Sequence, residues 1–146
     1  MSQRTPLLLT LILTALLFTI SCDNGEKEVA LLEKEVLDVH DEVMPLMGPR
    51  AEIDILVTSL QDSMAVYIAD STVDHSEKLA TFQEAIDGLE SANESMMTWM
   101  REYQPGIGDG QSLEDRLSYL NDELVKVNDM KALTLASIEA AKSLIQ

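Results

Sequence analysis

The chain has 146 residues, enough for one domain around a single hydrophobic core. It carries 26 Asp and Glu against 10 Lys and Arg, so its formal net charge at pH 7 is −16. A surface this acidic repels phosphate backbones, and no stripe of basic residues interrupts it, so we expect no nucleic-acid partner. The single cysteine, Cys22, excludes an intramolecular disulfide, and stability must come from packing.

The N-terminal segment predicts a secretory signal. Residues 7–20 are apolar except for three threonines, and one arginine precedes them. A run of about 14 residues is too short to cross roughly 30 Å of hydrocarbon as a helix, but it suits a signal peptide. Residues 19–22 read Thr-Ile-Ser-Cys and resemble the lipobox of bacterial lipoproteins, in which a small residue precedes a cysteine that is lipidated before cleavage. Ser21 and Cys22 fit that pattern, whereas Thr19 stands where an aliphatic residue is commoner.

These features divide the chain into a signal peptide (1–21), a lipidated polar tether (22–27) and a helical bundle domain (28–146). Acyl chains on Cys22 would anchor the protein firmly, since each buried methylene adds roughly 0.8 kcal/mol of membrane affinity. We therefore expect a lipid-anchored protein of the bacterial cell envelope, periplasm-facing or on the surface, whose membrane partner is reached through Cys22. Asp23 resembles the inner-membrane retention signal of some enteric bacteria, but that rule does not extend to all envelopes, and the outer membrane is favoured. The alternative is an ordinary signal peptide with an incidental cysteine at its end.

The first helical arm of the bundle is predicted to bend. Apolar residues recur at steps of three and four over residues 29–43, the pattern of an amphipathic helix. Pro45 lies within this pattern and Pro49 follows it, so the helix must kink or break there. The stripe resumes over residues 53–67 and ends before a polar turn at 70–74. This arm is therefore one bent helix or two collinear helices.

A third helical segment is predicted over residues 75–103, where apolar positions form a heptad seam in which Asn93 fills one core slot. Residues 105–110 contain one proline and three glycines, which end the helix. Ser112 then begins a capping box that opens a last helix over residues 113–145.

The predicted fold class follows from these segments. Long helices joined by short connections pack as antiparallel neighbours. No strand pattern or internal repeat appears in the sequence. We expect an all-α, elongated, coiled-coil-like antiparallel three-helix bundle, which becomes a four-helix bundle if the arm breaks at Pro45–Pro49.

A cluster of histidine and methionine is predicted near the proline break. His40, Met44 and Met47 share one helix face, at steps of four and three. The turn at 70–74 sets an antiparallel register in which Met44 lies opposite position 101 and Met47 opposite position 98, so methionines of the third segment come near. The candidate metal-binding residues are His40, Met44, Met47, Met96, Met97 and Met100.

The predicted ligand chemistry is that of a soft metal ion. Thioethers are soft ligands, and a site of His and Met suits Cu(I) or Ag(I). Trp99, Tyr103 and Tyr119 are predicted at the same level of the bundle. The competing interpretation is core packing, because methionine fills irregular gaps and gains sulfur–aromatic contacts without a metal. Haem bound between His40 and a methionine is a further variant, disfavoured by the absence of an attachment motif.

The sequence favours a non-enzymatic protein. It contains no nucleophile elbow, zinc-protease motif or glycine-rich phosphate loop. His75, the other histidine, stands beside Asp74 near a helix start, where we expect it at the surface. We expect no catalytic residue and no cofactor apart from the Cu(I) alternative.

Two blocks of the sequence resemble a group of small bacterial lipoproteins. The blocks are residues 39–45 (VHDEVMP, followed by Met47-Gly48) and residues 92–100 (ANESMMTWM), while Pro49 departs from the family pattern. Members are helical, acidic and begin with a lipidated cysteine, and some carry the uninformative label "viral A-type inclusion protein". The resemblance implies a bundle and a lipid anchor, and it implies no activity.

The functional prediction is a lipid-anchored envelope protein with a non-enzymatic binding or structural role. One alternative is a Cu(I)/Ag(I) chaperone or buffer that uses the His/Met cluster. The other is a coiled-coil module for self-association or for docking onto an envelope protein, suggested by the long heptad seams.

Overall fold

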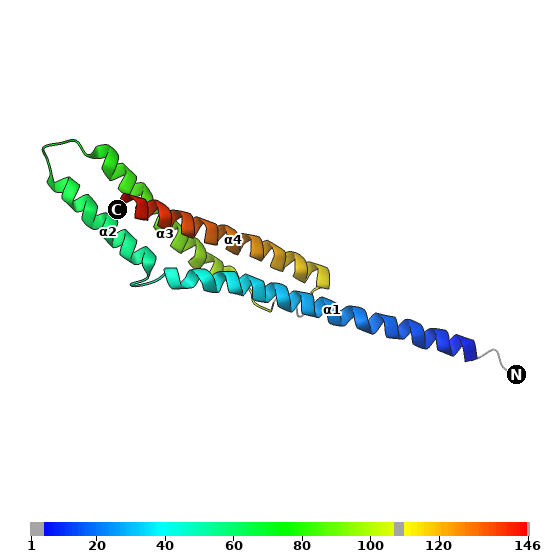
Figure 1. The fold of residues 1–146 in the computed structure, drawn as a ribbon. Helices are drawn as coiled ribbons and strands as arrows, with labels where there is room; N and C mark the ends of the chain where they lie inside the picture. The colour runs from blue at the N-terminus through cyan, green and yellow to red at the C-terminus, as the bar shows by residue number, and fades with distance from the viewer. Residues whose placement is uncertain (1–4, 107–109, 146) are drawn as a thin grey trace.

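The structure, a computed structural model, describes residues 5–106 and 110–145, with side chains from residue 24 onward. The described residues contain helices and connecting turns but no strand. Figure 1 shows an elongated bundle in which α1 and α4 run side by side, α2 continues past a bend, and α3 returns along α4. The predicted all-α antiparallel bundle is confirmed, with the arm broken so that four helices pack together. The elements are α1 (Thr5–Val43), the short 3-10 helix η1 (Met44–Leu46), α2 (Glu52–Ala69), α3 (Ser76–Glu102) and α4 (Leu113–Leu144).

The break in the arm has a local cause. Pro45 lies in η1, and because its ring removes a backbone donor it favours a helix start over a helix interior. Gly48 has a φ of 91°, a conformation that glycine adopts without the steric penalty of a side chain. Arg50 has a φ of 65°, and its backbone N–H donates to the Asp54 carboxylate at 2.9 Å. These turns redirect the chain between α1 and α2.

Helix α4 is the central element, since it packs against α1, α2 and α3. Helices α1 and α2 follow one another along it, and α3 covers another side (Figure 1). One hydrophobic core runs along these contacts and takes side chains from every helix. Side chains that are buried in it include Val36, Val43, Leu56, Leu60, Phe82, Ile86, Leu89 and Val127.

Ion pairs reinforce the contact between the arm and α4. Basic residues of α4 meet glutamates of α1 or α2 near the start, the middle and the end of α4. Partly exposed pairs of this kind contribute little stability individually, but they favour one register of α4 against the arm. The three pairs are Glu26–Arg116, Glu42–Lys131 and Glu52–Lys142.

The structure shifts one predicted core position of α3 by a single residue. Ala92 is fully buried, whereas Asn93 is only partly buried, so Ala92 takes the core position expected for Asn93. A straight helix has 3.6 residues per turn, and a heptad seam drifts around it by about 20° per heptad. The small alanine also lets neighbouring helices approach closely.

The segment predicted as a tether is helical and packed. Helix α1 runs through residues 22–27 without interruption. Gly25 is buried against Leu113, and a Cβ atom at residue 25 would lie 2.4 Å from Leu113 Cδ2. Glu26 Oε1 accepts a hydrogen bond from Arg116 Nη1 at 2.7 Å. Contacts with α4, which are not evident from the polar composition of the segment, hold it to the bundle.

Among the described residues, no helix combines the length and the apolar character needed to cross a membrane.

Candidate functional site

The histidine and methionine residues meet in a register different from the predicted one. The expected register placed Met44 opposite position 101. In the structure it is His40, one turn earlier, that contacts Met100. The residues between the end of α1 at Val43 and the start of α2 at Glu52 form a bend and do not extend a continuous helix. As a result, α3 is shifted along α1 relative to the expected register.

His40 is held between partners on two sides. Its Nδ1 lies 2.9 Å from Asp41 Oδ1, and its Nε2 lies 3.2 Å from Met100 Sδ. The imidazole ring lies 5.6 Å from the Trp99 ring, centroid to centroid. The His40 side chain is 18% exposed, so the ring is largely enclosed but remains reachable from solvent.

The other candidate sulfur atoms divide into two groups. Met47 and Met96 belong to the hydrophobic core, and Met44 packs against it together with Met100. Met97 is 39% exposed and lies outside this core, contrary to the expected convergence. Because consecutive helix residues are about 100° apart, burial of Met96 turns its neighbour away.

Aromatic rings extend from the histidine toward α4. Trp99 stacks on Tyr103 with a centroid distance of 4.8 Å, and Tyr103 faces Tyr119 at 6.3 Å. The prediction that these rings lie together is confirmed. Burial and the nearby Glu33 carboxylate raise the pKa of Tyr103 to about 12. The Tyr103 hydroxyl is buried and has no hydrogen-bond partner within the described part of the chain.

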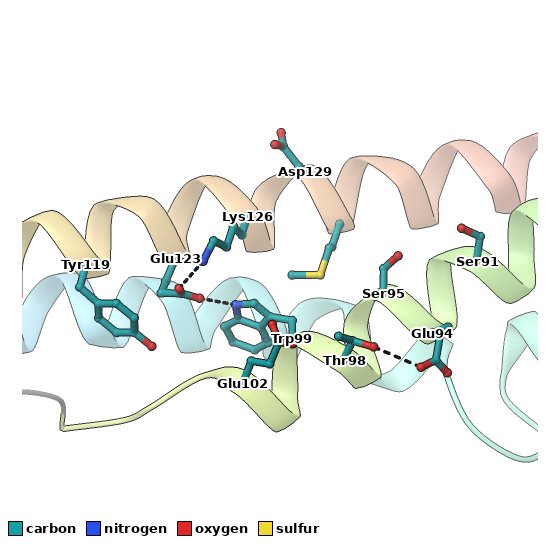
Figure 2. A pocket seen from close by; sticks show the side chains of 11 residues that line it. Ser91, Glu94, Ser95, Thr98, Trp99, Glu102, Tyr119, Glu123, Lys126 and Asp129 are labelled. Atoms are coloured by element: carbon teal, nitrogen blue, oxygen red, sulfur yellow. Dashed lines mark hydrogen bonds and ion pairs between the residues drawn. The ribbon is translucent and has the colours of Figure 1, made fainter.

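A buried carboxylate that sequence reasoning missed lies beside these rings. Glu123 is 4% exposed and accepts hydrogen bonds from Trp99 Nε1 and Lys126 Nζ, each at 2.7 Å (Figure 2). The hydrogen bond to Glu123 is the main reason that the pKa of Lys126 is raised. Glu123 follows Leu120 by three residues and precedes Val127 by four. This helical spacing was the signal that could have placed Glu123 on the buried face of the helix.

An open groove of about 780 Å³ runs between α3 and α4 over this carboxylate. Figure 2 shows side chains from both helices around it. Hydroxyl and carboxyl groups lie around the largely buried Trp99 ring and give the groove a polar rim. Its lining includes Ser95, Thr98, Glu102, Tyr119, Lys126 and Asp129.

Metal-binding chemistry at this level would depend on sulfur. Within residues 5–106 and 110–145, no group of three or more His, Cys, Asp or Glu side chains is placed to hold a metal ion. The donors that the fold does bring together are the His40 imidazole and the Met100 thioether. That pair suits a soft ion better than a hard one.

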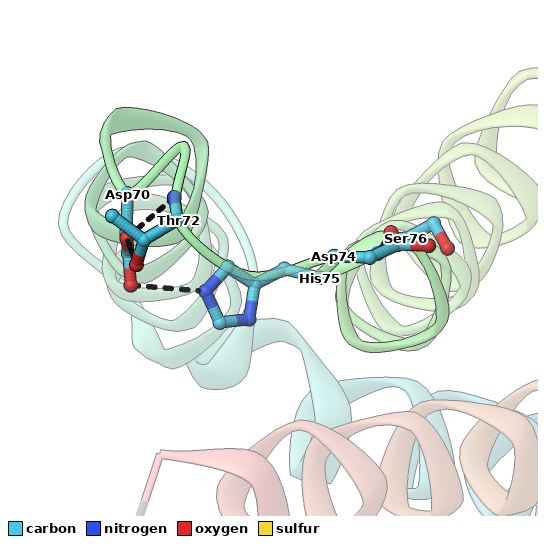
Figure 3. A network of polar contacts seen from close by, with 5 residues as sticks. All are labelled: Asp70, Thr72, Asp74, His75 and Ser76. Carbon is cyan, nitrogen blue, oxygen red and sulfur yellow. Dashed lines mark hydrogen bonds and ion pairs between the residues drawn. The ribbon is translucent and has the colours of Figure 1, made fainter.

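A separate polar network closes the turn between α2 and α3 (Figure 3). Asp70 Oδ1 accepts hydrogen bonds from the hydroxyl and the backbone N–H of Thr72. Asp70 Oδ2 lies 3.3 Å from His75 Nε2, and the His75 ring meets the Tyr67 ring edge-on. The hydrogen bonds from Thr72, followed by that from His75, lower the pKa of Asp70 to about 2.

This network predicts a stability difference that depends on pH. A carboxylate with a depressed pKa stabilises the folded state above its unfolded pKa of about 4, and the contribution disappears as the pH falls toward 2. Asp70→Asn should therefore lower the midpoint of thermal unfolding at pH 6 and leave it unchanged near pH 2. Circular dichroism melts across this range would measure the difference, with Asp62→Asn, an exposed acid on α2, as the control. A difference of equal size at both pH values would contradict the assignment.

Comparison with protein families, with curated proteins and with solved structures found no match to this chain.

Proposed function

We propose that the chain is a lipid-anchored protein of the bacterial cell envelope whose helical bundle has a non-enzymatic, spacing or binding role. The anchor is proposed from the lipobox-like residues 19–22, and the observation that supports the spacing role is the continuity of α1 (Thr5–Val43), which includes both Cys22 and the core residues Val36 and Val43. A lipid on Cys22 would sit on the same helix that forms the bundle. The bundle would then be held stiffly at the membrane and would not swing on a linker.

Contacts close to the anchor support this stiffness. Gly25 packs against Leu113 at the start of α4, and Glu26 pairs with Arg116 one turn further along α4. The loop after α3 is also held to α1, because the Gly106 backbone N–H donates to Glu33 Oε1 at 2.6 Å. The first two contacts involve the start of α4 and the third involves the loop before it, so all three join α1 to the same end of the bundle.

The dimensions and the charge of the bundle suit a spacer. Helix α4 alone has 32 residues, which is about 48 Å at 1.5 Å per residue. The turn between α2 and α3 lies at the end of the bundle remote from α1's N-terminus (Figure 1). With a net charge of −16, the protein would be repelled by anionic headgroups, which favours a bundle that projects away from the bilayer.

The anchor is tested by replacing the predicted lipidated residue. Cys22→Ser, expressed in a bacterium with lipoprotein processing, should lose the mass of the acyl groups and should leave the membrane fraction. Intact-mass spectrometry and fractionation measure both effects. Ser21→Ala keeps a small residue before the cysteine and should be processed normally. An unmodified Cys22 in the unaltered protein, or cleavage downstream of it, would contradict the proposal.

A further inference from the structure

We propose that His40 and Met100 form a binding site for a soft monovalent cation, Cu(I) or Ag(I). This inference names a ligand for the binding role and does not depend on the lipid anchor. It rests on the contact between His40 Nε2 and Met100 Sδ, which joins α1 to α3 at 3.2 Å.

The two contacts of the His40 ring cannot both be satisfied by a neutral imidazole. Such a ring carries one N–H, and we assign it to Nδ1, because Asp41 Oδ1 lies 2.9 Å away and a carboxylate is a stronger acceptor than a thioether sulfur. Nε2 then directs its lone pair at the Met100 sulfur, which has no hydrogen to donate. Two electron-rich atoms at this distance favour a cation between them. A proton is the competing occupant, and metal titration decides between the two.

The hydrogen bond to Asp41 also has the form expected around a metal-bound histidine. Ligating histidines commonly donate their other ring N–H to a carboxylate, which fixes the ring and raises the basicity of the ligand nitrogen. Asp41 Oδ1 lies 2.9 Å from Nδ1, so in the assigned tautomer it accepts the Nδ1–H hydrogen bond. Asp41 is therefore a positioning residue for the site.

The separation of the two donors is compatible with an inserted ion. With the bond lengths of a zinc site taken as a guide, about 2.0 Å to nitrogen and about 2.3 Å to sulfur, two donor atoms that meet the ion at a tetrahedral angle lie about 3.5 Å apart. The observed 3.2 Å needs only a small widening, which the flexible methionine side chain can supply.

Each of the two helices that form the site carries a further methionine about one turn away. Met44, the first residue of η1, follows His40 by four residues, and Met96 precedes Met100 by four residues on α3. Because α1 and α3 run in opposite directions, both steps lead to the same level of the bundle. Met96 is buried in the core and Met44 packs against it, so either could complete the coordination of an ion held by His40 and Met100.

The chain carries its own reporter for this site. Trp99 is the only tryptophan, and its ring centroid lies 5.6 Å from that of His40. A heavy, soft ion bound at Nε2 should quench Trp99 fluorescence, while an ion bound elsewhere on the acidic surface should not.

Titration of the full chain with Ag(I), and with Cu(I) against a chromogenic chelator, tests the proposal. All proteins would carry Cys22→Ser so that no thiol competes for the metal. We expect one ion per chain together with quenching of Trp99. His40→Ala and Met100→Leu should each weaken binding at least tenfold, and Asp41→Asn should weaken it about tenfold.

The matched controls are His75→Ala, which changes the histidine near the far turn, and Met97→Leu, which changes an exposed methionine on the same helix. Both should bind as the parent does. Absence of saturable binding, or equal affinity in the parent, His40→Ala and Met100→Leu, would overturn the proposal. If His40→Ala does not fold by circular dichroism, Met100→Leu decides the outcome, because it conserves side-chain volume. Since every protein lacks Cys22, failure here is separate from failure of the anchor.

Discussion

Replacing Leu89 by alanine is expected to lower the free energy of unfolding by about 3 kcal/mol. Leu89 is fully buried on α3, which packs against α2 and α4. Truncation removes its apolar contacts and leaves a cavity that neighbouring helices can only partly close. Urea denaturation followed by helical circular dichroism measures the change.

Leu31→Ala is the matched control for this measurement. Leu31 is 69% exposed on α1, so its truncation should change the free energy of unfolding by less than about 0.5 kcal/mol. Equal losses for the two variants would mean that Leu89 does not occupy the core of the bundle as described.

Replacing Glu123 by alanine should destabilise the protein by about 2 kcal/mol. The Trp99 indole N–H, on a side chain only 6% exposed, would lose its acceptor and remain buried without a partner. Glu123→Gln keeps a carbonyl oxygen in reach of the indole and should cost less than about 1 kcal/mol. Urea denaturation of both variants measures the difference.

A double-mutant cycle isolates the hydrogen bond itself. Trp99→Phe removes the donor, so Glu123→Ala made in that background should cost clearly less than in the parent chain. Additive losses in the cycle would contradict a direct energetic link between Trp99 and Glu123. The result matters for the candidate site, because this bond fixes the ring that lies beside His40.

Local chemistry made most of the helical layout predictable. The helices follow the steps of three and four in the apolar residues, and the interruptions follow Pro45 and the glycine-rich segment after Pro105. Ser112 was expected to cap the last helix, and its hydroxyl accepts from the Asp115 backbone N–H at 3.2 Å. These features depend on backbone geometry and on hydrogen bonds between near neighbours, so they can be read from short stretches of sequence.

The candidate site was only partly predictable. The sequence indicated that His40 and the block around Met100 lie at one level, and it placed Trp99 and Tyr103 beside them. It did not indicate that Met97 turns outward or that Glu123 is buried under Trp99. The exposure of Met97 and the burial of Glu123 depend on how far α3 and α4 are rotated about their axes. That rotation is set by packing against the neighbouring helices.

By itself, the sequence determined that this chain is a set of amphipathic helices with defined breaks, and it predicts lipidation at Cys22. Tertiary structure alone decided the packing of Gly25 on Leu113, the core position of Ala92, and the contact between His40 and Met100. The physical reason is the range of the interactions. Helix formation and termination involve residues within about one turn of each other, whereas register and rotation are set by side chains far apart in the chain.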